Sequence, residues 1–446
     1  MKHLLPFILA AAQLMSSTPA QSQQYLGSKT LYKPLQKKYT KVPLDNQPVF
    51  LNYLGRHGAR NLTKDVAKST AWMFIFKADS AKALSQRGQQ LKAVLVHLQK
   101  VELKNLESIS EIGKQELRGI AARAYHVEPR FFAPNQHILV NTTSKERTKQ
   151  SAMAFLAGAS AAAKGKIASI KWNEQDDVNL RFFDLSKPYL SFKASGPWHS
   201  SYDQLAKMLK QEAISVRIFN TFFLADYSKR INTKEKIRFA DDLYGFYSIL
   251  PAIHQEIMKE GLSAKELSLN PFFTAAELAI LSQLNDADNF LKKGPGRDNN
   301  GIQVRISAPL LVDFIRSTDA FIQSKPYSAV LRFAHAETVA PFAAILNLDG
   351  ASTATKNIQT FDQLWKAKNI IPFSANIQML LYKNPYNNSY LVKFLLNEKE
   401  TKIKGLGTKI PPYYLYKDVR AFYLKKLKAF GLSLNSNMEE YLNNAQ

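Results

Sequence analysis

The sequence has no cysteine in its 446 residues, and it has no uninterrupted apolar run of about 20 residues, the length that a membrane span needs. Without cysteine the chain forms no disulfide bond and cannot carry a lipid on an amino-terminal cysteine. Two ligand motifs are missing as well, the His-Glu-x-x-His zinc pattern and the Gly-x-x-x-x-Gly-Lys-Ser/Thr phosphate loop. We therefore expect no membrane span, no metal, no nucleoside triphosphate and no other cofactor.

Acidic residues are scarce beside basic ones. Aspartate and glutamate number 36 against 60 lysines and arginines, which gives a net charge of +24. A field of this sign steers a polyanionic substrate towards a cleft. It would attract nucleic acid equally, but the lysines occur in small clusters without zinc-finger spacing, an aromatic RNP-like stretch or a basic zipper. The sequence therefore favours a small polyanionic ligand over nucleic acid.

The amino-terminal segment has the three parts of a secretory signal peptide. A short positive region, Met1 to His3, precedes an apolar core from Leu4 to Leu14, and small residues up to Ala20 offer a cleavage site. We expect residues 1–20 to be removed on export, which leaves a periplasmic or secreted bacterial protein. With about 46% hydrophobic residues, the remaining chain can form a large core.

A basic loop follows an apolar run near the start of the mature chain. The run 49–54 predicts a strand. One glycine after it stands a pentapeptide whose informative residues are Arg56, His57, Gly58 and Arg60. Arginine forks bind phosphoryl oxygens, a neutral imidazole can attack phosphorus, and a residue without Cβ lets the backbone turn tightly and approach a phosphate. The pattern predicts a phosphate site at the carboxyl end of a strand, with a solvated basic turn as the alternative.

A second polar motif lies far along the chain and repeats this layout. His335 and Glu337 follow a short apolar strand at 329–333 and precede an apolar, helix-like stretch at 338–346. A histidine beside a carboxylate is often a hydrogen-bonded structural pair. Because the first motif already offers a phosphate site, we favour a catalytic pair.

Together the two motifs resemble the histidine acid phosphatases, and within them the multiple inositol polyphosphate phosphatase branch. An Arg-His-Gly-x-Arg loop marks the family, and His-Ala-Glu in place of the commoner His-Asp marks the branch. The strand-like 137–140 and the segment 143–152 resemble the family region that supplies a third phosphate-binding arginine, here Arg147; the alternative is an arginine on a helix surface paired with a neighbour. Segments 110–115 and 376–397, the second hairpin-like, also resemble family segments, so the likeness covers nearly the whole mature chain.

The resemblance implies a metal-independent reaction through a phosphohistidine. His57 would attack phosphorus, and protonated Glu337 would donate its proton to the leaving oxygen and later act as base. The groups expected to bind the phosphoryl oxygens are Arg56, Arg60, Arg147 and His335. The implied substrate is phytate, myo-inositol hexakisphosphate. Two alternatives stay open: a broad-specificity acid phosphatase acting on sugar phosphates or phosphoglycerates, and a noncatalytic binder of phosphorylated ligands.

Four more basic residues are expected to bind substrate, Lys64, Lys292, Lys293 and Arg297, and the last three could reach distal phosphates of a large substrate. The last three lie in a turn broken by glycine and proline, for which an exposed loop is the alternative. Many members of the family have a proline two residues after the second arginine of the loop, and this chain does not. The path of the chain after Arg60 is therefore not predicted. Glycosylation sequons stand at Asn61, Asn141 and Asn387, and we regard the first two as accidental.

The order of patterns along the chain predicts an α/β fold with an insert. Strand and helix patterns alternate from about residue 48 to 165, and the last third returns to strands. We expect a discontinuous α/β catalytic domain, residues 21–192 and 326–446, interrupted by a mostly α-helical insert domain, residues 193–325. The resemblance implies the same architecture, histidine-phosphatase-like, with the active site in the cleft between the two parts. Helices are expected, among others, at 80–99, 115–125, 202–212, 240–250, 308–322 and 418–430. The oligomeric state is left open.

Overall fold

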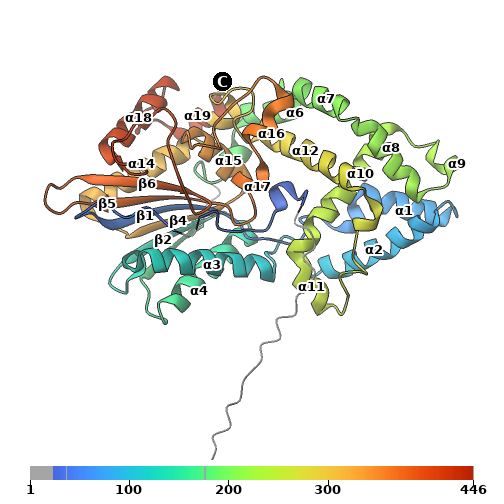
Figure 1. Ribbon diagram of the computed structural model, residues 1–446, viewed down its shortest axis with the longest axis horizontal. Coiled ribbons are helices and arrows are strands. Elements are labelled where there is room, and N and C mark those ends of the chain that lie inside the picture. Colours follow the sequence, from blue (N-terminus) through green and yellow to red (C-terminus); the bar gives the residue numbers. More distant parts are fainter. Residues whose placement is uncertain (1–23, 37, 175–176, 445–446) are drawn as a thin grey trace, which may run out of the picture.

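A mixed β-sheet organises the protein (Figure 1). The computed structural model describes residues 24–36, 38–174 and 177–444, so the expected signal peptide at 1–20 lies outside the described residues. Within them, eight strands follow the order β3-β2-β4-β1-β5-β6-β7, with β8 beside β6. The strands are β1 (Gln47–Arg56), β2 (His137–Thr142), β3 (Ser169–Glu174), β4 (Ala329–Ala334), β5 (Asn376–Lys383), β6 (Tyr390–Leu396), β7 (Lys399–Thr401) and β8 (Tyr414–Leu415). The half from β3 to β1 is parallel and the half from β5 onward is antiparallel.

Strand β1 lies between the two halves, parallel to β4 and antiparallel to β5. Its side chains alternate between two apolar clusters: Phe50 and Leu54 pack on one face of the sheet, and Leu51 and Tyr53 pack on the other. A strand buried on both faces appears in the sequence as a continuous apolar run rather than an alternating one. The strand expected at 49–54 is confirmed, as are the strand at 329–333 and the hairpin within 376–397.

Helices cover both faces of the sheet (Figure 1). On the face of Leu51 and Tyr53 lie α3 (Glu111–Val127) and α4 (Glu146–Ala162), and on the other face lie α14 (Ala308–Ser324), α15 (Ala336–Ile345) and α18 (Tyr416–Ala429). This arrangement is the mixed α/β architecture expected from the sequence. It directs the carboxyl ends of the parallel strands β1, β2 and β4 to one edge of the sheet, where open α/β folds place their ligand sites.

A second group of helices lies beside the sheet and has its own apolar cluster (Figure 1). It contains α1 (Thr70–Ser80), α2 (Gln86–Glu102), α8 (Gln211–Phe222), α10 (Thr233–Ile249) and α11 (His254–Lys259). The remaining α-helices are α5 (Phe182–Leu185), α6 (Lys187–Ser195), α7 (Trp198–Met208), α9 (Ala225–Ser228), α12 (Ala275–Lys292), α13 (Ile302–Arg305), α16 (Phe361–Leu364), α17 (Ala367–Ile370) and α19 (Met438–Asn444). Short 3₁₀ turns are η1 (Gly27–Lys29), η2 (Val66–Lys68), η3 (Pro129–Phe132), η4 (Leu250–Ile253), η5 (Asn270–Phe272) and η6 (Ile358–Thr360).

Apolar packing divides the chain differently from its sequence order. Helices α1 and α2 precede residue 193 but share the cluster of α8 and α10, whereas α14 lies before residue 325 but packs on the sheet. Packing alone does not define a domain, so the bounds of the insert at 193 and 325 stay a prediction.

Two expected helices have other limits in the structure. The helix expected at 80–99 is α2, which begins at Gln86 because Lys82 has a positive φ of 51° and the Ser85 side chain caps the new helix by accepting from the Gly88 N–H. The helix expected at 202–212 is two helices, because Lys210, with φ at 55°, interrupts α7 and α8. Periodicity predicts an apolar face but does not detect a single left-handed residue.

No helix in the described part of the chain is long and apolar enough to cross a membrane.

Candidate active site

The basic loop begins where β1 ends, at Arg56. The Arg56 N–H donates to the Ala375 carbonyl at 2.7 Å and the His57 N–H donates to the Ala334 carbonyl at 3.0 Å, so the loop is fixed to the chain on both sides of β1. The His57 carbonyl in turn accepts from the Ser374 N–H at 3.1 Å. These bonds hold His57 at the carboxyl edge of the sheet, as the sequence predicted for this loop.

His57 is 4% exposed, and its ring has a defined tautomer. Nδ1 lies 3.0 Å from the Gly58 carbonyl oxygen, which only accepts, so Nδ1 carries the proton and Nε2 carries the lone pair. Burial, followed by the charges of Arg56 and Arg60, holds the pKa of His57 well below its ordinary value. The imidazole is therefore neutral and its free Nε2 is the nucleophilic atom.

The positive charges of three arginines act on His57 and lower its pKa further. In each of them the buried Nε has no hydrogen-bond partner: Arg56, Arg60 and Arg147. Burial and then Arg60 lower the pKa of Arg56 to about 9, while burial and then Arg147 lower the pKa of Arg60 to about 10. All three stay charged at neutral pH and repel one another. Unsatisfied buried donors and mutual repulsion are both relieved by a bound dianion, so this cluster is suited to a phosphate.

Arg56 is also oriented by the backbone. Its Nη1 donates to the carbonyl of Ser28, which belongs to η1, and to the carbonyl of Ile371, both at 2.5 Å. The guanidinium carbon lies 4.8 Å from the centroid of the Phe373 ring. Nη1 is thus held by the backbone, whereas the buried Nε has no partner and is left for a ligand.

His335 is the residue before α15, and two neighbours set its tautomer. Arg147, in the first turn of α4, lies with Nη2 3.4 Å from Nδ1 of His335, and an arginine only donates. Nε2 therefore carries the proton and donates to Oγ1 of the buried Thr143 at 3.2 Å. Burial, and then the charge of Arg147, lowers the pKa of His335 to about 3. The ring centroids of His335 and His57 are 5.8 Å apart, so the two sequence motifs meet in one site.

Glu337, in the first turn of α15, pairs with a residue of the basic turn. Nζ of Lys293 lies 2.8 Å from Oε1 of Glu337. Burial raises the pKa of Glu337, but the Lys293 ammonium and then His335 outweigh burial and hold the pKa well below its ordinary value. Without a substrate, Glu337 is therefore a carboxylate.

The other three basic residues predicted to bind substrate have different surroundings. Lys292 forms a short ion pair with Asp288, and its Nζ lies 4.7 Å from the centroid of the Trp198 ring. Arg297 is exposed, and Lys64 is exposed near Asp242 of α10. Of the four, Lys293 contacts another predicted site residue, Glu337. A substrate contact by the other three stays a prediction.

Gly58 and Gly113 bring the loop against the first turn of α3. A Cβ on Gly58 would lie 2.8 Å from the Gly113 carbonyl oxygen, and a Cβ on Gly113 would lie 2.1 Å from the Ala59 carbonyl oxygen. We expected Gly58 to permit a close approach to phosphate, and its backbone instead approaches α3. The requirement for glycine thus comes from packing between two backbones.

The exit path of the loop is an antiparallel contact with residues 107–110. The Ser110 N–H donates to the Ala59 carbonyl at 2.8 Å, and the Glu107 N–H donates to the Leu62 carbonyl at 2.8 Å. Glu107 also pairs with Arg147 at 3.2 Å. The sequon residue Asn61 is 1% exposed in this contact, so its side chain is inaccessible.

Sequence reasoning missed two polar residues that shape the site. The carboxylate of Glu116 accepts from the Ala59 N–H at 3.0 Å, the Tyr32 N–H at 2.7 Å and the Ser374 hydroxyl at 2.7 Å, so it joins three segments around the loop. Arg181 contributes a positive charge that lowers the pKa of both Arg147 and His335. Neither residue stands in a motif, and only the fold brings them to the loop.

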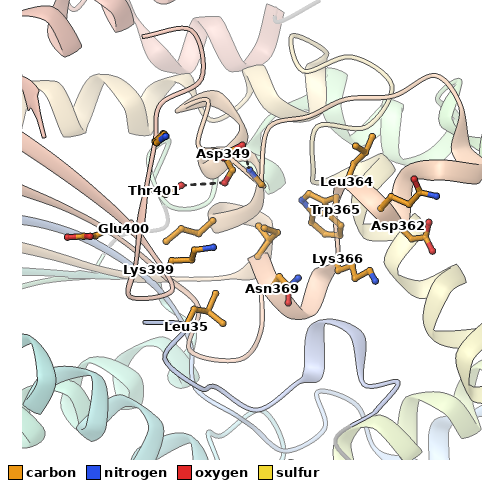
Figure 2. Close-up of a pocket in the computed structure, with 15 residues that line it drawn as sticks. Leu35, Asp349, Asp362, Leu364, Trp365, Lys366, Asn369, Lys399, Glu400 and Thr401 are labelled. Carbon is orange, nitrogen blue, oxygen red and sulfur yellow. Dashed lines mark hydrogen bonds between the residues drawn. The ribbon is translucent and has the colours of Figure 1, made fainter. Parts of the chain in front are cut away.

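A pocket of about 700 Å³ lies elsewhere, beside β7 (Figure 2). Its lining includes Asp349, Asp362, Glu400, Lys366, Lys399 and Trp365, and none of the predicted site residues. The mixture of acidic and basic side chains does not favour a polyanion. Among the described residues, no group of three or more histidine, aspartate or glutamate side chains is placed to hold a metal ion.

The constellation can perform nucleophilic substitution at phosphorus. A neutral histidine offers a lone pair, three arginines neutralise phosphoryl oxygens, and a carboxylate lies on the neighbouring helix beside His335. Phosphoryl transfer depends mainly on such positioning and charge neutralisation.

Comparison with known proteins identifies the family by sequence and finds solved structures with a similar fold. Residues 49–397 match the histidine phosphatase superfamily (branch 2). Multiple inositol polyphosphate phosphatase 1 of Gallus gallus is 23% identical over 342 residues, 72% of this chain and 69% of that protein. The crystal structure of Bifidobacterium longum multiple inositol polyphosphate phosphatase, complexed with inositol hexasulfate, superposes with a TM-score of 0.77 and 19% identity, covering 90% of this chain and 97% of the other. The phytase of D. castellii gives a TM-score of 0.64 at 14% identity, covering 98% and 92%.

Proposed function

This chain belongs to branch 2 of the histidine phosphatase superfamily, and from that premise we propose that it is a phosphomonoester hydrolase that removes phosphates from phytate and lower inositol polyphosphates. The reaction runs through a phosphohistidine on His57 and needs no metal. The observation that carries the proposal is the neutral His57, with Nε2 unprotonated, among three arginines whose buried Nε atoms have no partner. A protein that only binds phosphate has use for the arginines but not for the nucleophile.

In the first half of the reaction, Nε2 of His57 forms a bond to phosphorus while the bond from phosphorus to the ester oxygen breaks. Arg56, Arg60 and Arg147 neutralise the charge on the transferred group. His335 accepts from Arg147 through Nδ1 and so helps to orient that arginine. The departing alkoxide takes a proton from Glu337, since an inositol oxygen is a poor leaving group without one.

In the second half, the Glu337 carboxylate takes a proton from water as the water oxygen attacks the phosphohistidine. The nitrogen-phosphorus bond breaks, inorganic phosphate leaves, and His57 regains its lone pair. The Gly58 carbonyl keeps Nδ1 protonated throughout, so the same nitrogen is regenerated for the next cycle.

Support for an inositol polyphosphate comes from charge and from relatives. The net charge of +24 favours a substrate with many phosphates. The Gallus gallus relative is named for multiple inositol polyphosphates, and the Bifidobacterium longum relative was solved with inositol hexasulfate, a six-fold anion on the same ring. A site built for several anionic groups matches the excess of basic residues in this chain.

The test is release of inorganic phosphate from phytate by the purified protein in excess EDTA, with His57→Ala assayed in parallel. We expect release by the wild type only, and a phosphoenzyme trapped by quenching in alkaline denaturant in the wild type alone, because the nitrogen-phosphorus bond of phosphohistidine is labile in acid and survives in alkali. Release that requires an added divalent cation would overturn the metal-independent route. If phytate is inert but sugar phosphates or phosphoglycerates are hydrolysed, the enzyme is a broad-specificity phosphatase; binding of phosphate without any turnover would make it a noncatalytic binder.

We further propose that the protein is exported, to the periplasm or the medium, after cleavage near Ala20. The support is the sequence pattern of residues 1–20, a positive start, an apolar core and small residues before the cleavage point. Mass spectrometry of the protein from culture medium and osmotic-shock fluid tests this: the expected mature chain begins near Gln21, and an intact Met1 in the cytosolic fraction alone would contradict export.

A further inference from the structure

The ion pair between Lys293 and Glu337 conflicts with the role that the reaction requires of Glu337. A general acid must carry a proton, yet Oε1 of Glu337 lies 2.8 Å from the Lys293 ammonium. The two side chains are 19% and 31% exposed, so the pair is accessible to a ligand. The resting enzyme therefore holds its acid in the wrong protonation state.

The groups that face Glu337 come from every side of the site. Lys293 follows α12, His335 precedes α15, and Tyr189 of α6 lies close enough for the carboxylate to raise the tyrosine pKa. The charges of three arginines also reach it: Arg56, Arg60 and Arg147. A bound phosphate neutralises those arginines, and of the other groups that oppose protonation the Lys293 ammonium has the largest effect, ahead of His335.

Lys293 has an anchored backbone and an accessible side chain. Its N–H donates to the Asn289 carbonyl at 2.9 Å, and the Gly294 N–H donates to the same oxygen at 3.0 Å, which fixes the end of α12. A Cβ on Gly294 would lie 3.0 Å from the Phe290 carbonyl oxygen and 3.3 Å from the Trp365 ring, so the backbone has little room to move. The neighbouring Lys292 pairs instead with Asp288. A change of partner by Lys293 is thus a side-chain rotation that leaves the helix in place.

We propose that Lys293 is a positioning residue that keeps Glu337 ionised in the empty site and releases it when a second phosphate of the substrate binds the Lys293 ammonium. Glu337 then takes up a proton from solvent and donates it to the leaving oxygen as the phosphorus-oxygen bond breaks. The proton that it takes from the attacking water in the second half returns to solvent when Lys293 pairs with the carboxylate again. Substrates with one phosphate cannot draw Lys293 away while that phosphate occupies the arginines. The inference rests on the proposed hydrolase function and gives it a basis for preferring polyphosphates.

The experiment compares three substrates in wild type, Lys293→Met, Lys293→Arg and Glu337→Gln. Phytate has many phosphates and a poor leaving group, glycerol 2-phosphate has one phosphate and a poor leaving group, and p-nitrophenyl phosphate has one phosphate and a leaving group that needs no proton. In Lys293→Met, we expect the alkaline limb of kcat for glycerol 2-phosphate to move up by at least one pH unit and the KM for phytate to rise several-fold. Turnover of p-nitrophenyl phosphate should be affected less than that of glycerol 2-phosphate, because its leaving group needs no proton.

Three variants separate this role from a structural one: Lys293→Arg, a double variant and a control at Lys229. Lys293→Arg keeps the positive charge and should keep the wild-type alkaline limb, while the double variant with Glu337→Gln should lose the shift caused by Lys293→Met. Lys229→Met removes an exposed ion pair with Asp226 on α9 and serves as the matched control with unchanged kinetics.

An unmoved alkaline limb in Lys293→Met, in an enzyme that still hydrolyses p-nitrophenyl phosphate, overturns the role of Lys293 and leaves the hydrolase proposal intact. An equal fall in kcat for all three substrates in both Lys293 variants would show a structural role and also overturns it. If the wild type hydrolyses none of the three esters, the proposed function fails and this inference fails with it.

Discussion

Replacing Thr143 by valine removes one hydroxyl from the centre of the site. Thr143 is fully buried, and its Oγ1 accepts from Nε2 of His335 at 3.2 Å and lies 3.0 Å from Oγ1 of Thr148. Valine keeps the shape of the side chain and removes the acceptor. His335 then has a buried N–H without a partner and a ring whose tautomer is fixed from one side only, by Arg147.

The expected loss can be worked out from these contacts. Thr148 keeps two acceptors for its hydroxyl, the carbonyls of Thr143 at 3.1 Å and Lys145 at 2.7 Å, so its loss is small. The unpaired donor on His335 costs about 1–3 kcal/mol of unfolding free energy, which for a chain of this size lowers the Tm by about 1–3 °C. In metal sites, loss of the group that orients a histidine costs about 10- to 100-fold in activity, and we expect a fall in kcat/KM of similar size.

The assay pairs thermal unfolding with steady-state kinetics on p-nitrophenyl phosphate, in Thr143→Val and in Thr318→Val. Thr318 is equally buried and has two hydrogen bonds, to the Phe314 carbonyl and from the Asn52 amide, but it lies on α14 under the sheet. Both variants should lose similar stability, and only Thr143→Val should lose activity. Thr143→Val with the stability of Thr318→Val and the kinetics of the wild type would refute the argument that Thr143 orients His335.

Three other outcomes are expected. Gly58→Ala places a Cβ 2.8 Å from the Gly113 carbonyl and should lower both Tm and kcat/KM, so wild-type values in both would contradict the tight contact. Because the pKa of His57 is held well below 6.5, kcat/KM corrected for substrate ionisation should show no loss as pH falls through 6.5; such a loss would show that His57 is protonated there. Burial raises the pKa of Asp286 from 3.8 to about 7, so the folded state retains a proton that the unfolded chain releases, and stability is lost as pH rises between these values. The Tm of Asp286→Asn should therefore exceed the wild-type Tm at pH 8 but not at pH 4. An equal difference in Tm at both pH values would contradict the raised pKa of Asp286.

The sequence predicted the parts of the site that follow from local order. A continuous apolar run ending in a basic loop gave β1 and placed Arg56 and His57 at its end, because a strand buried on both faces has that pattern. The second run gave β4 and, after it, His335 at the start of a helix. The carboxyl ends of β1 and β4 lie together because parallel neighbouring strands end at the same edge of a sheet. The pairing of β1 with β4 therefore brings the two motifs into one site.

Contacts between distant segments could not be predicted in the same way. Glu116 is a charged residue beside the buried face of α3, and nothing in its sequence neighbours shows that it accepts from Tyr32, Ala59 and Ser374. The partners of the two lysines in the basic turn could not be predicted either. Lys292 and Lys293 are adjacent and chemically identical, yet one points to Asp288 and the other to Glu337, because consecutive side chains at a helix end diverge.

The central place of β1 has a consequence for synthesis of the chain. Both of its partners, β4 and β5, come later in the sequence, and the first of them begins at Ala329. At a ribosomal rate of ~5–20 residues per second, the apolar strand ending at Arg56 waits roughly 15–55 s for its first neighbour. During that interval it offers two unpaired edges and two uncovered apolar faces, the features that promote aggregation. We therefore expect the yield during overproduction to rise when a holding chaperone is supplied.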